Sequence, residues 1–190
     1  MAFTNLQSRL KNSLPSNYDG PLMSDHIAHL FLTASVKGMQ RSEDALNRCI
    51  DKLSDEQMWH RGGDHENSIA NLLLHLEGNL RQWFLHGIDG QPDVRHRDSE
   101  FALSPSQRCA EIRSRFAATL AECRNVIGSL PPARLLEVIN PQPTGIWPPA
   151  TILEAIYRVT GHLQSHQGQI ILLTKHLTGA DLDLSVPRKR

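Results

Sequence analysis

The chain has 190 residues and a mass of 21.3 kDa, a length typical of one domain with a core that needs no disulfide bridges. Its 20 basic and 20 acidic residues give a formal net charge of zero, which argues against a surface that binds nucleic acid over its whole extent. No apolar run approaches the ~20 residues needed to cross a bilayer, and the polar N-terminus does not resemble a secretion signal. We therefore expect a cytoplasmic protein that binds neither nucleic acid nor membranes.

The chain is predicted to divide into an N-terminal arm over 1–23, a helical domain over 24–182 and a basic C-terminal tail over 183–190. Inside the domain, four segments have apolar residues at helical spacing. These segments are 24–53, 67–87, 104–130 and 150–178.

Capping signals support two of the predicted helix starts. Ser104 suits an N-cap and Gln107 can close a capping box with it. Thr151 and Glu154 form the same pattern before the last segment, and Gly179 suits the end of that helix. Strand-like alternation is confined to a short piece over 137–147. Four helices with one apolar stripe each predict an all-α protein, a four-helix bundle.

The cysteines and histidines give different signals. The three cysteines lie far apart with no CxxC pair, which indicates buried thiols and neither disulfides nor a cysteine metal site. They are Cys49, Cys109 and Cys123. The ten histidines are unusually many for 190 residues. Histidine is therefore the residue type to follow.

Two histidines of the last segment lie on its apolar face. His166 stands at a seam position between Leu163 and Ile170, and His162 lies one turn earlier on the same face. This i,i+4 spacing lets two imidazoles converge on one ion. His75 flanks the apolar stripe of the second segment. Three such histidines from two facing helices would form a metal site with open positions, although a hydrogen-bonded core histidine remains the alternative for each.

The other histidines are weaker candidates. His86 lies eleven residues from His75, about 16 Å along a helix, too far to meet the same ion. His26 and His29 suit an exposed helix start, and three further histidines fall in predicted loops: His60, His65 and His96. The sequence between His162 and His166 lacks the glutamate of HExxH, which excludes a zinc protease of that kind.

Three segments carry a family resemblance. They are LEAIYR at 153–158 with the HxxxH pair and the following GQI at 168–170, the stretch from Ser68 through His75 to Trp83, and the connector PDVRHRDSEF at 92–101. Together they resemble the DinB/YfiT-like metalloenzyme superfamily, within it an uncharacterised subfamily, over about residues 24 to 182.

The resemblance implies a four-helix bundle, often dimeric, that binds a divalent ion such as nickel or zinc through His75, His162 and His166. Some relatives are transferases or isomerases that use a low-molecular-weight thiol such as mycothiol, bacillithiol or glutathione, and many have no assigned reaction. We therefore expect a homodimer that acts on a small molecule.

Polar residues near the three histidines are candidates for orienting them or for binding substrate. Arg158 lies one turn before the HxxxH pair and Gln169 lies one turn after it. Asn79 and Gln82 follow the histidine of the second segment by four and seven residues. Arg158 suits a carboxylate of a substrate or thiol, and the amides suit the imidazoles. A solvated arginine and a polar bundle edge are the alternative.

The sequence leaves the catalytic residues unknown. Glu77 is predicted to point away from His75, and Glu154 is used in capping, so a metal-activated thiol or water is the expected nucleophile. The alternative is a non-catalytic metal-binding bundle, structural or small-ligand-binding. A cavity beside the histidines would favour the first hypothesis, and tryptophans would either line it or pack on the bundle: Trp59, Trp83 and Trp147.

Overall fold

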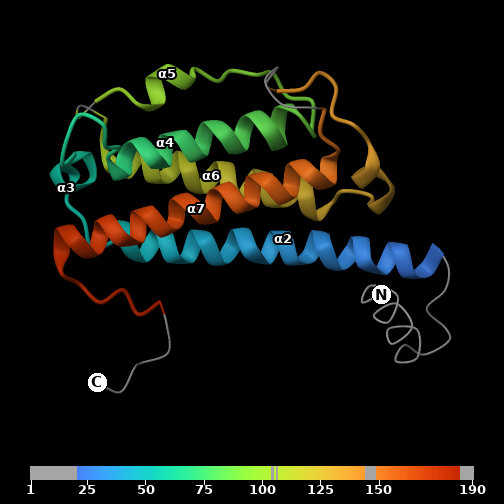
Figure 1. Cartoon of the computed structure of the whole chain (residues 1–190), viewed down its shortest axis with the longest axis horizontal. Coiled ribbons are helices and arrows are strands. Elements are labelled where there is room, and N and C mark those ends of the chain that lie inside the picture. The colour runs from blue at the N-terminus through green and yellow to red at the C-terminus, as the bar shows by residue number, and fades with distance from the viewer. Residues whose placement is uncertain (1–20, 104, 106, 144–148, 185–190) are drawn as a thin grey trace, which may run out of the picture.

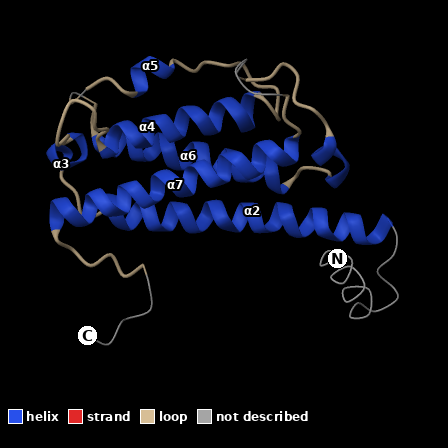
Figure 2. Cartoon of the chain, viewed as in Figure 1, coloured by secondary structure: helices blue, strands red, loops and turns tan. Residues whose placement is uncertain are grey.

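The structure, a computed structural model, describes residues 21–103, 105, 107–143 and 149–184. These residues form six α-helices, a π-helical turn and a 3-10 turn, and they contain no strand (Figure 2). The elements are α2 (Pro21–Ile50), α3 (Asp55–Trp59), α4 (Ile69–Leu80), η1 (Arg81–His86), α5 (Arg97–Glu100), α6 (Cys109–Gly128), η2 (Pro132–Leu136) and α7 (Ile152–Thr178).

The four long helices pack as a bundle. Helix α2 contacts α6 and α7, and α4 also contacts α6 and α7. Figure 1 shows these four helices running alongside one another, with the short helix α5 and the connector around it lying over α4. The predicted all-α fold is confirmed, and the bundle is consistent with the DinB/YfiT-like type. In the part of the chain described, no helix combines the length and apolar character needed to cross a membrane.

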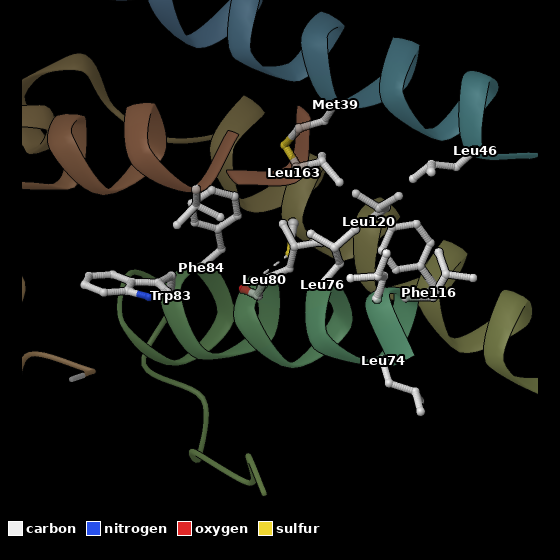
Figure 3. Packing of buried hydrophobic residues seen from close by; sticks show 14 of the residues in the cluster. Met39, Leu46, Leu74, Leu76, Leu80, Trp83, Phe84, Phe116, Leu120 and Leu163 are labelled. Carbon is white, nitrogen blue, oxygen red and sulfur yellow. Dashed lines mark hydrogen bonds between the residues drawn. The ribbon is translucent and has the colours of Figure 1, made fainter. Parts of the chain in front are cut away.

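The bundle core lies between the apolar stripes of these helices. Figure 3 shows Met39 of α2 and Leu163 of α7 meeting Leu76, Leu80 and other residues of α4 and α6. The cysteines belong to this core, since all three are free and buried, as predicted.

The start of the third long helix was predicted wrongly. Helix α6 begins at Cys109, and its N-cap is Arg108, which makes no side-chain capping bond. Ser104 lies outside the described residues. Tertiary hydrogen bonds hold the preceding segment in place: Asn71 Nδ2 donates to the carbonyls of Glu100 and Ala102 at 2.8 Å each. These bonds fix residues 100 and 102, just before the predicted start. Inside the predicted helix, the carbonyl of Gln107 accepts from Trp59 Nε1 at 3.1 Å, and the first helical bonds go to the carbonyl of Arg108.

The boundaries of α2 differ from the predicted ones by only a few residues. Helix α2 begins at Pro21, three residues before the predicted position and inside the segment assigned to the arm, and ends at Ile50. Proline is common at the first turn of a helix because its missing N–H would have no partner there. The remainder of the predicted arm, 1–20, and most of the predicted tail, 185–190, lie outside the described residues.

The second predicted helix is divided between α4 and the π-helical turn η1. The N–H of Gly87 bonds to the carbonyl of Gln82 at 3.1 Å, five residues back. Such turns are frequent near functional sites, and this one carries Gln82 and Trp83, both of which line the cavity described below.

The capping signals around α7 are confirmed. Thr151 is the N-cap, its hydroxyl accepts from the N–H of Glu154, and Glu154 accepts from the N–H of Thr151 at 2.9 Å. Gly179 ends the helix with a φ of 65°, a backbone conformation that glycine adopts without strain. Within the predicted extended piece, 137–147, Val138 forms an isolated antiparallel bridge with Thr151. Residues 144–147 of that piece lie outside the described residues.

Removing this cap should have a modest cost. We expect Thr151→Ala to lower the free energy of unfolding by about 1 kcal/mol, because the first turn of α7 loses a hydrogen-bond acceptor. Urea denaturation of the metal-free protein measures it. Ser114→Ala is the matched control, since Ser114 is exposed inside α6; an equal loss in that variant would contradict a capping effect.

Candidate metal centre

Three histidines from α4 and α7 meet at one point in the bundle. The Nε2 atoms of His75 and His162 are 2.9 Å apart. The ring centroids of His162 and His166 are separated by 4.4 Å, and those of His75 and His166 by 5.2 Å. One nitrogen of each ring lies within 4.8 Å of the other two, so these residues can hold a metal ion.

The donor set fits a divalent ion. Two imidazole nitrogens bound at ~2.1 Å to the same ion lie roughly 2.9 to 3.4 Å apart for ordinary coordination angles. The separation of 2.9 Å between His75 and His162 agrees with this range. His75 is buried and the other two are partly exposed, so one side of the site remains accessible.

Hydrogen bonds to the second ring nitrogens set the tautomers of two histidines. His75 Nδ1 lies 2.8 Å from Glu100 Oε2, and an ionised carboxylate only accepts, so this nitrogen carries the proton. His166 Nδ1 likewise donates to Gln169 Oε1 at 2.7 Å. In both rings Nε2 is then unprotonated and free to bind a metal.

The environment keeps the imidazoles of α7 neutral. Burial, together with the nearby His166, His75 and Arg95, lowers the pKa of His162 from 6.5 to about 4. Burial and the neighbouring His75 also lower the pKa of His166, against the effect of its bond to Gln169. Both side chains are therefore in the metal-binding form at neutral pH.

The metal-free protein should therefore lose stability in acid. We expect its free energy of unfolding to fall by about 1 kcal/mol between pH 7 and pH 5, because His162 binds a proton near pH 6.5 when unfolded and near pH 4 when folded. Well above pH 6.5 His162 is neutral in both states and its contribution to stability is fully present; the loss grows as the pH falls towards 4. Urea denaturation in a chelator measures it. His162→Asn should show a flatter pH dependence, and an unchanged slope would contradict this assignment.

Metal affinity should follow the same direction. Protonated imidazole does not ligate, so binding should weaken in acid. A free imidazole would give this loss below about pH 6, and the lowered pKa values of His162 and His166 move it to lower pH. Zinc titrations from pH 7 to pH 4 measure it.

Sequence analysis missed two residues that complete this site, Glu100 and Arg95. Arg95 Nε and Nη2 donate to the Glu100 carboxylate at 2.7 and 2.9 Å, and Arg95 Nη1 donates to Gln82 Oε1 at 2.9 Å. Burial by itself would raise the pKa of Glu100, but the bonds from Arg95 and His75 hold it below its usual value. The connector motif at 92–101 contains both residues, yet only the folded chain brings this segment to His75.

Two features of α4 dock the connector. Asn71 binds its backbone, as described above, and Gly78 faces its carboxylate. A Cβ atom at Gly78 would overlap Glu100 Oε1 and lie 3.1 Å from Arg95 Nε. Glycine in the middle of a helix costs roughly 1 kcal/mol relative to alanine. Its presence here is explained by the close approach of Glu100.

A cavity of about 820 Å³ opens beside the histidines. It lies between α4 and η1, the connector and α7. Its lining includes His75 and His162 together with Asn79, Gln82, Trp83, Arg95, Arg97, Ala155, Arg158 and Val159.

Of the four polar residues predicted near the histidines, one contacts a histidine and three line the cavity. Gln169 contacts His166, whereas Arg158, Asn79 and Gln82 line the cavity and contact no histidine through a described hydrogen bond. Gln82 instead donates to Asp93 Oδ2 at 2.9 Å and accepts from Arg95, which fastens the connector to η1.

Other side chains lie away from the site. Glu77 pairs with Arg115 at 2.9 Å, and His86 Nδ1 lies 2.7 Å from the Gln91 carbonyl oxygen. Trp59 packs in the core and donates to the Gln107 carbonyl at 3.1 Å. Trp147 lies outside the described residues.

Fold and site together define a helical bundle with a three-histidine cluster that can hold a metal ion. Residues 26–190 match the family described as Protein of unknown function (DUF1572), and the chain belongs to this family. No curated protein matches the chain. Among solved structures it is similar to one described as the crystal structure of the conserved protein of locus from Enterococcus faecalis, with a TM-score of 0.61 and 15% identity. That match covers 78% of this chain and 97% of the other, and at this identity it shows the fold alone.

Proposed function

We propose that this protein is a metal-dependent enzyme of the DinB/YfiT-like superfamily, in which a thiol or water attacks a small electrophile. The observation that carries this proposal is the cavity of about 820 Å³ beside the three histidines. Structural metal sites are closed by their ligands, whereas catalytic sites keep an open position next to the ion. Nickel and zinc are the ions we expect, and imidazole suits both.

An ion at this site would supply Lewis-acid activation of a thiol or water nucleophile. The side chains of the protein would bind and orient. Glu100 and Gln169 hold the rings of His75 and His166, and Trp83 offers an apolar wall to the substrate. No acidic side chain among the described residues lines the cavity, which agrees with a mechanism that needs no strong protein base.

The cysteines are poor nucleophiles in this structure. Burial, reinforced by neighbouring acidic residues, raises the pKa of Cys109 and Cys123 to about 12. Burial also raises the pKa of Cys49. Thiols in this state are almost entirely protonated at neutral pH, and the thiolate is the reactive form.

We therefore expect single Cys→Ser variants at these three positions to keep full metal content and at least about half of any turnover, since an exogenous nucleophile does not depend on them. Metal analysis and steady-state rates measure this. Abolished turnover with intact metal content in any one variant would replace the proposal with covalent cysteine catalysis.

The proposal itself is tested on protein purified without a histidine tag. Metal analysis comes first, followed by calorimetry with glutathione, bacillithiol and mycothiol and by rates with epoxides, haloaromatics and maleyl-type isomerisation substrates. Metal-dependent turnover is the expected result. One equivalent of metal without thiol binding or turnover would favour the alternative, a non-catalytic metal-binding bundle. We also propose that the protein is a homodimer, as the family resemblance implies, and light scattering measures its oligomeric state.

A further inference from the structure

The charges lining the cavity beside the histidines have one sign. Three arginines line it, Arg95, Arg97 and Arg158, and no aspartate or glutamate is among its described lining residues. The charge of Arg95 is balanced by Glu100, with which it makes two hydrogen bonds. Arg97 and Arg158 have no ion-pair partner among the residues described. The residues that line the cavity therefore carry a net positive charge.

These two arginines come from different elements. Arg97 is in α5, where its guanidinium carbon lies 5.2 Å from the centroid of the Phe101 ring, and that ring is 5.0 Å from the ring of His75. Arg158 is exposed on α7, one turn before His162. Glu154 lies one turn before Arg158 and accepts the capping bonds from Thr151. It interacts with Arg158 electrostatically but forms no ion pair with it. Both guanidinium groups remain available to a ligand.

The rest of the lining adds an apolar surface and one unsatisfied acceptor. Trp83, Ala155 and Val159 are buried apolar residues of the cavity. Asn79 Oδ1 is buried and has no hydrogen-bond partner among the described residues. A buried polar atom without a partner is costly, about 1 to 3 kcal/mol, and therefore indicates a donor that the described residues do not provide.

We propose that this cavity binds a small organic carboxylate. Arg97 and Arg158 bind the carboxylate, the apolar body packs against Trp83 and Val159, and a donor on the ligand reaches Asn79 Oδ1. Guanidinium groups match carboxylates in shape and charge, and about 820 Å³ lies within the usual range for small-molecule sites. The inference rests on the proposed function and names its substrate class, an anionic electrophile.

The test compares 1-naphthoate with its neutral analogue 1-naphthamide by calorimetry, using the full chain both metal-free and loaded with zinc. Naphthamide has N–H donors that naphthoate lacks, so a bond to Asn79 Oδ1 would favour the amide and cannot account for tighter binding of naphthoate. Naphthoate should bind at least about tenfold more tightly than naphthamide in both forms. Arg97→Gln and Arg158→Gln should each weaken naphthoate binding by about 5- to 10-fold and leave naphthamide binding and zinc content unchanged. Arg108→Gln is the matched control, because Arg108 is exposed, outside the cavity and carries the same charge.

Several outcomes would overturn the inference. Equal binding of the two probes would show that charge does not select the ligand. Naphthoate binding that needs zinc and is unchanged in both arginine variants would show that the ion alone holds the carboxylate. Equal weakening in the Arg108→Gln control would indicate a long-range effect of net charge. A chain that binds no zinc but retains arginine-dependent naphthoate binding would contradict the proposed metal enzyme and leave the carboxylate site standing.

Discussion

Replacing His166 with alanine is expected to abolish stoichiometric binding of a divalent ion. Only His75 and His162 would remain, and two imidazoles provide fewer than the three protein ligands typical of zinc sites that keep an open position. The same loss is expected for alanine at either of the other two histidines, since all three nitrogens converge within 4.8 Å. Elemental analysis after dialysis against trace zinc or nickel measures the content.

His86→Ala and His26→Ala are the controls for this prediction. His86 contacts the Gln91 carbonyl and His26 is exposed on α2, so neither variant should lose metal. Circular dichroism of the His166→Ala variant checks that the bundle has formed. A full equivalent of metal in that folded variant would refute the ligand set.

Replacing Glu100 with alanine is expected to destabilise the metal-free protein by about 3 to 5 kcal/mol, the range observed when one partner of a buried ion pair is removed. The side chains of Glu100 and Arg95 are each only 7% exposed, so Arg95 would be left as a buried charge without its carboxylate. Urea denaturation in a chelator measures the loss. Glu77→Ala is the matched control, because the Arg115 partner of Glu77 is 52% exposed and such a pair contributes at most about 1 kcal/mol.

The conservative variant Glu100→Gln separates stability from metal binding. An amide retains the volume and one acceptor, so folding should be less affected, while zinc affinity should fall by about 10- to 100-fold because His75 loses the carboxylate that orients it. Gly78→Ala should also lower zinc affinity, since the added Cβ atom would overlap Glu100 Oε1 and displace the carboxylate from His75. Unchanged zinc affinity in both variants would show that Glu100 supports the fold and not the histidine.

The local sequence was sufficient for the helical bundle and for the two histidines of α7. The four apolar stripes predicted the bundle, and the Thr151 and Gly179 signals marked both ends of α7 correctly. His162 and His166 share a face because helical spacing places residues four apart on one side, whatever the helix packs against. Such properties depend on neighbours within one or two turns.

The start of α6 and the surroundings of His75 were decided by tertiary structure. The capping pattern near Ser104 is locally reasonable, yet the Gln107 carbonyl accepts from Trp59 in the core and the helix begins only at Cys109. Glu100 lies 25 residues from His75 in the chain but hydrogen-bonds to it at 2.8 Å.

By itself, the sequence determined that helices would form, which faces would be apolar, and that two imidazoles would lie one turn apart on α7. Tertiary structure brings His75 to them, as the family resemblance implied. Tertiary structure alone decided that Arg95 and Glu100 would be buried as a pair beside His75 and that a cavity would open next to the histidines. The spacing of apolar residues in the sequence predicts which side chains share one face of a helix. The site depends on where the connector at 92–101 packs against the bundle. That position is determined by the close approach of Glu100 to Gly78, the hydrogen bonds from Asn71 and the buried ion pair of Arg95 and Glu100.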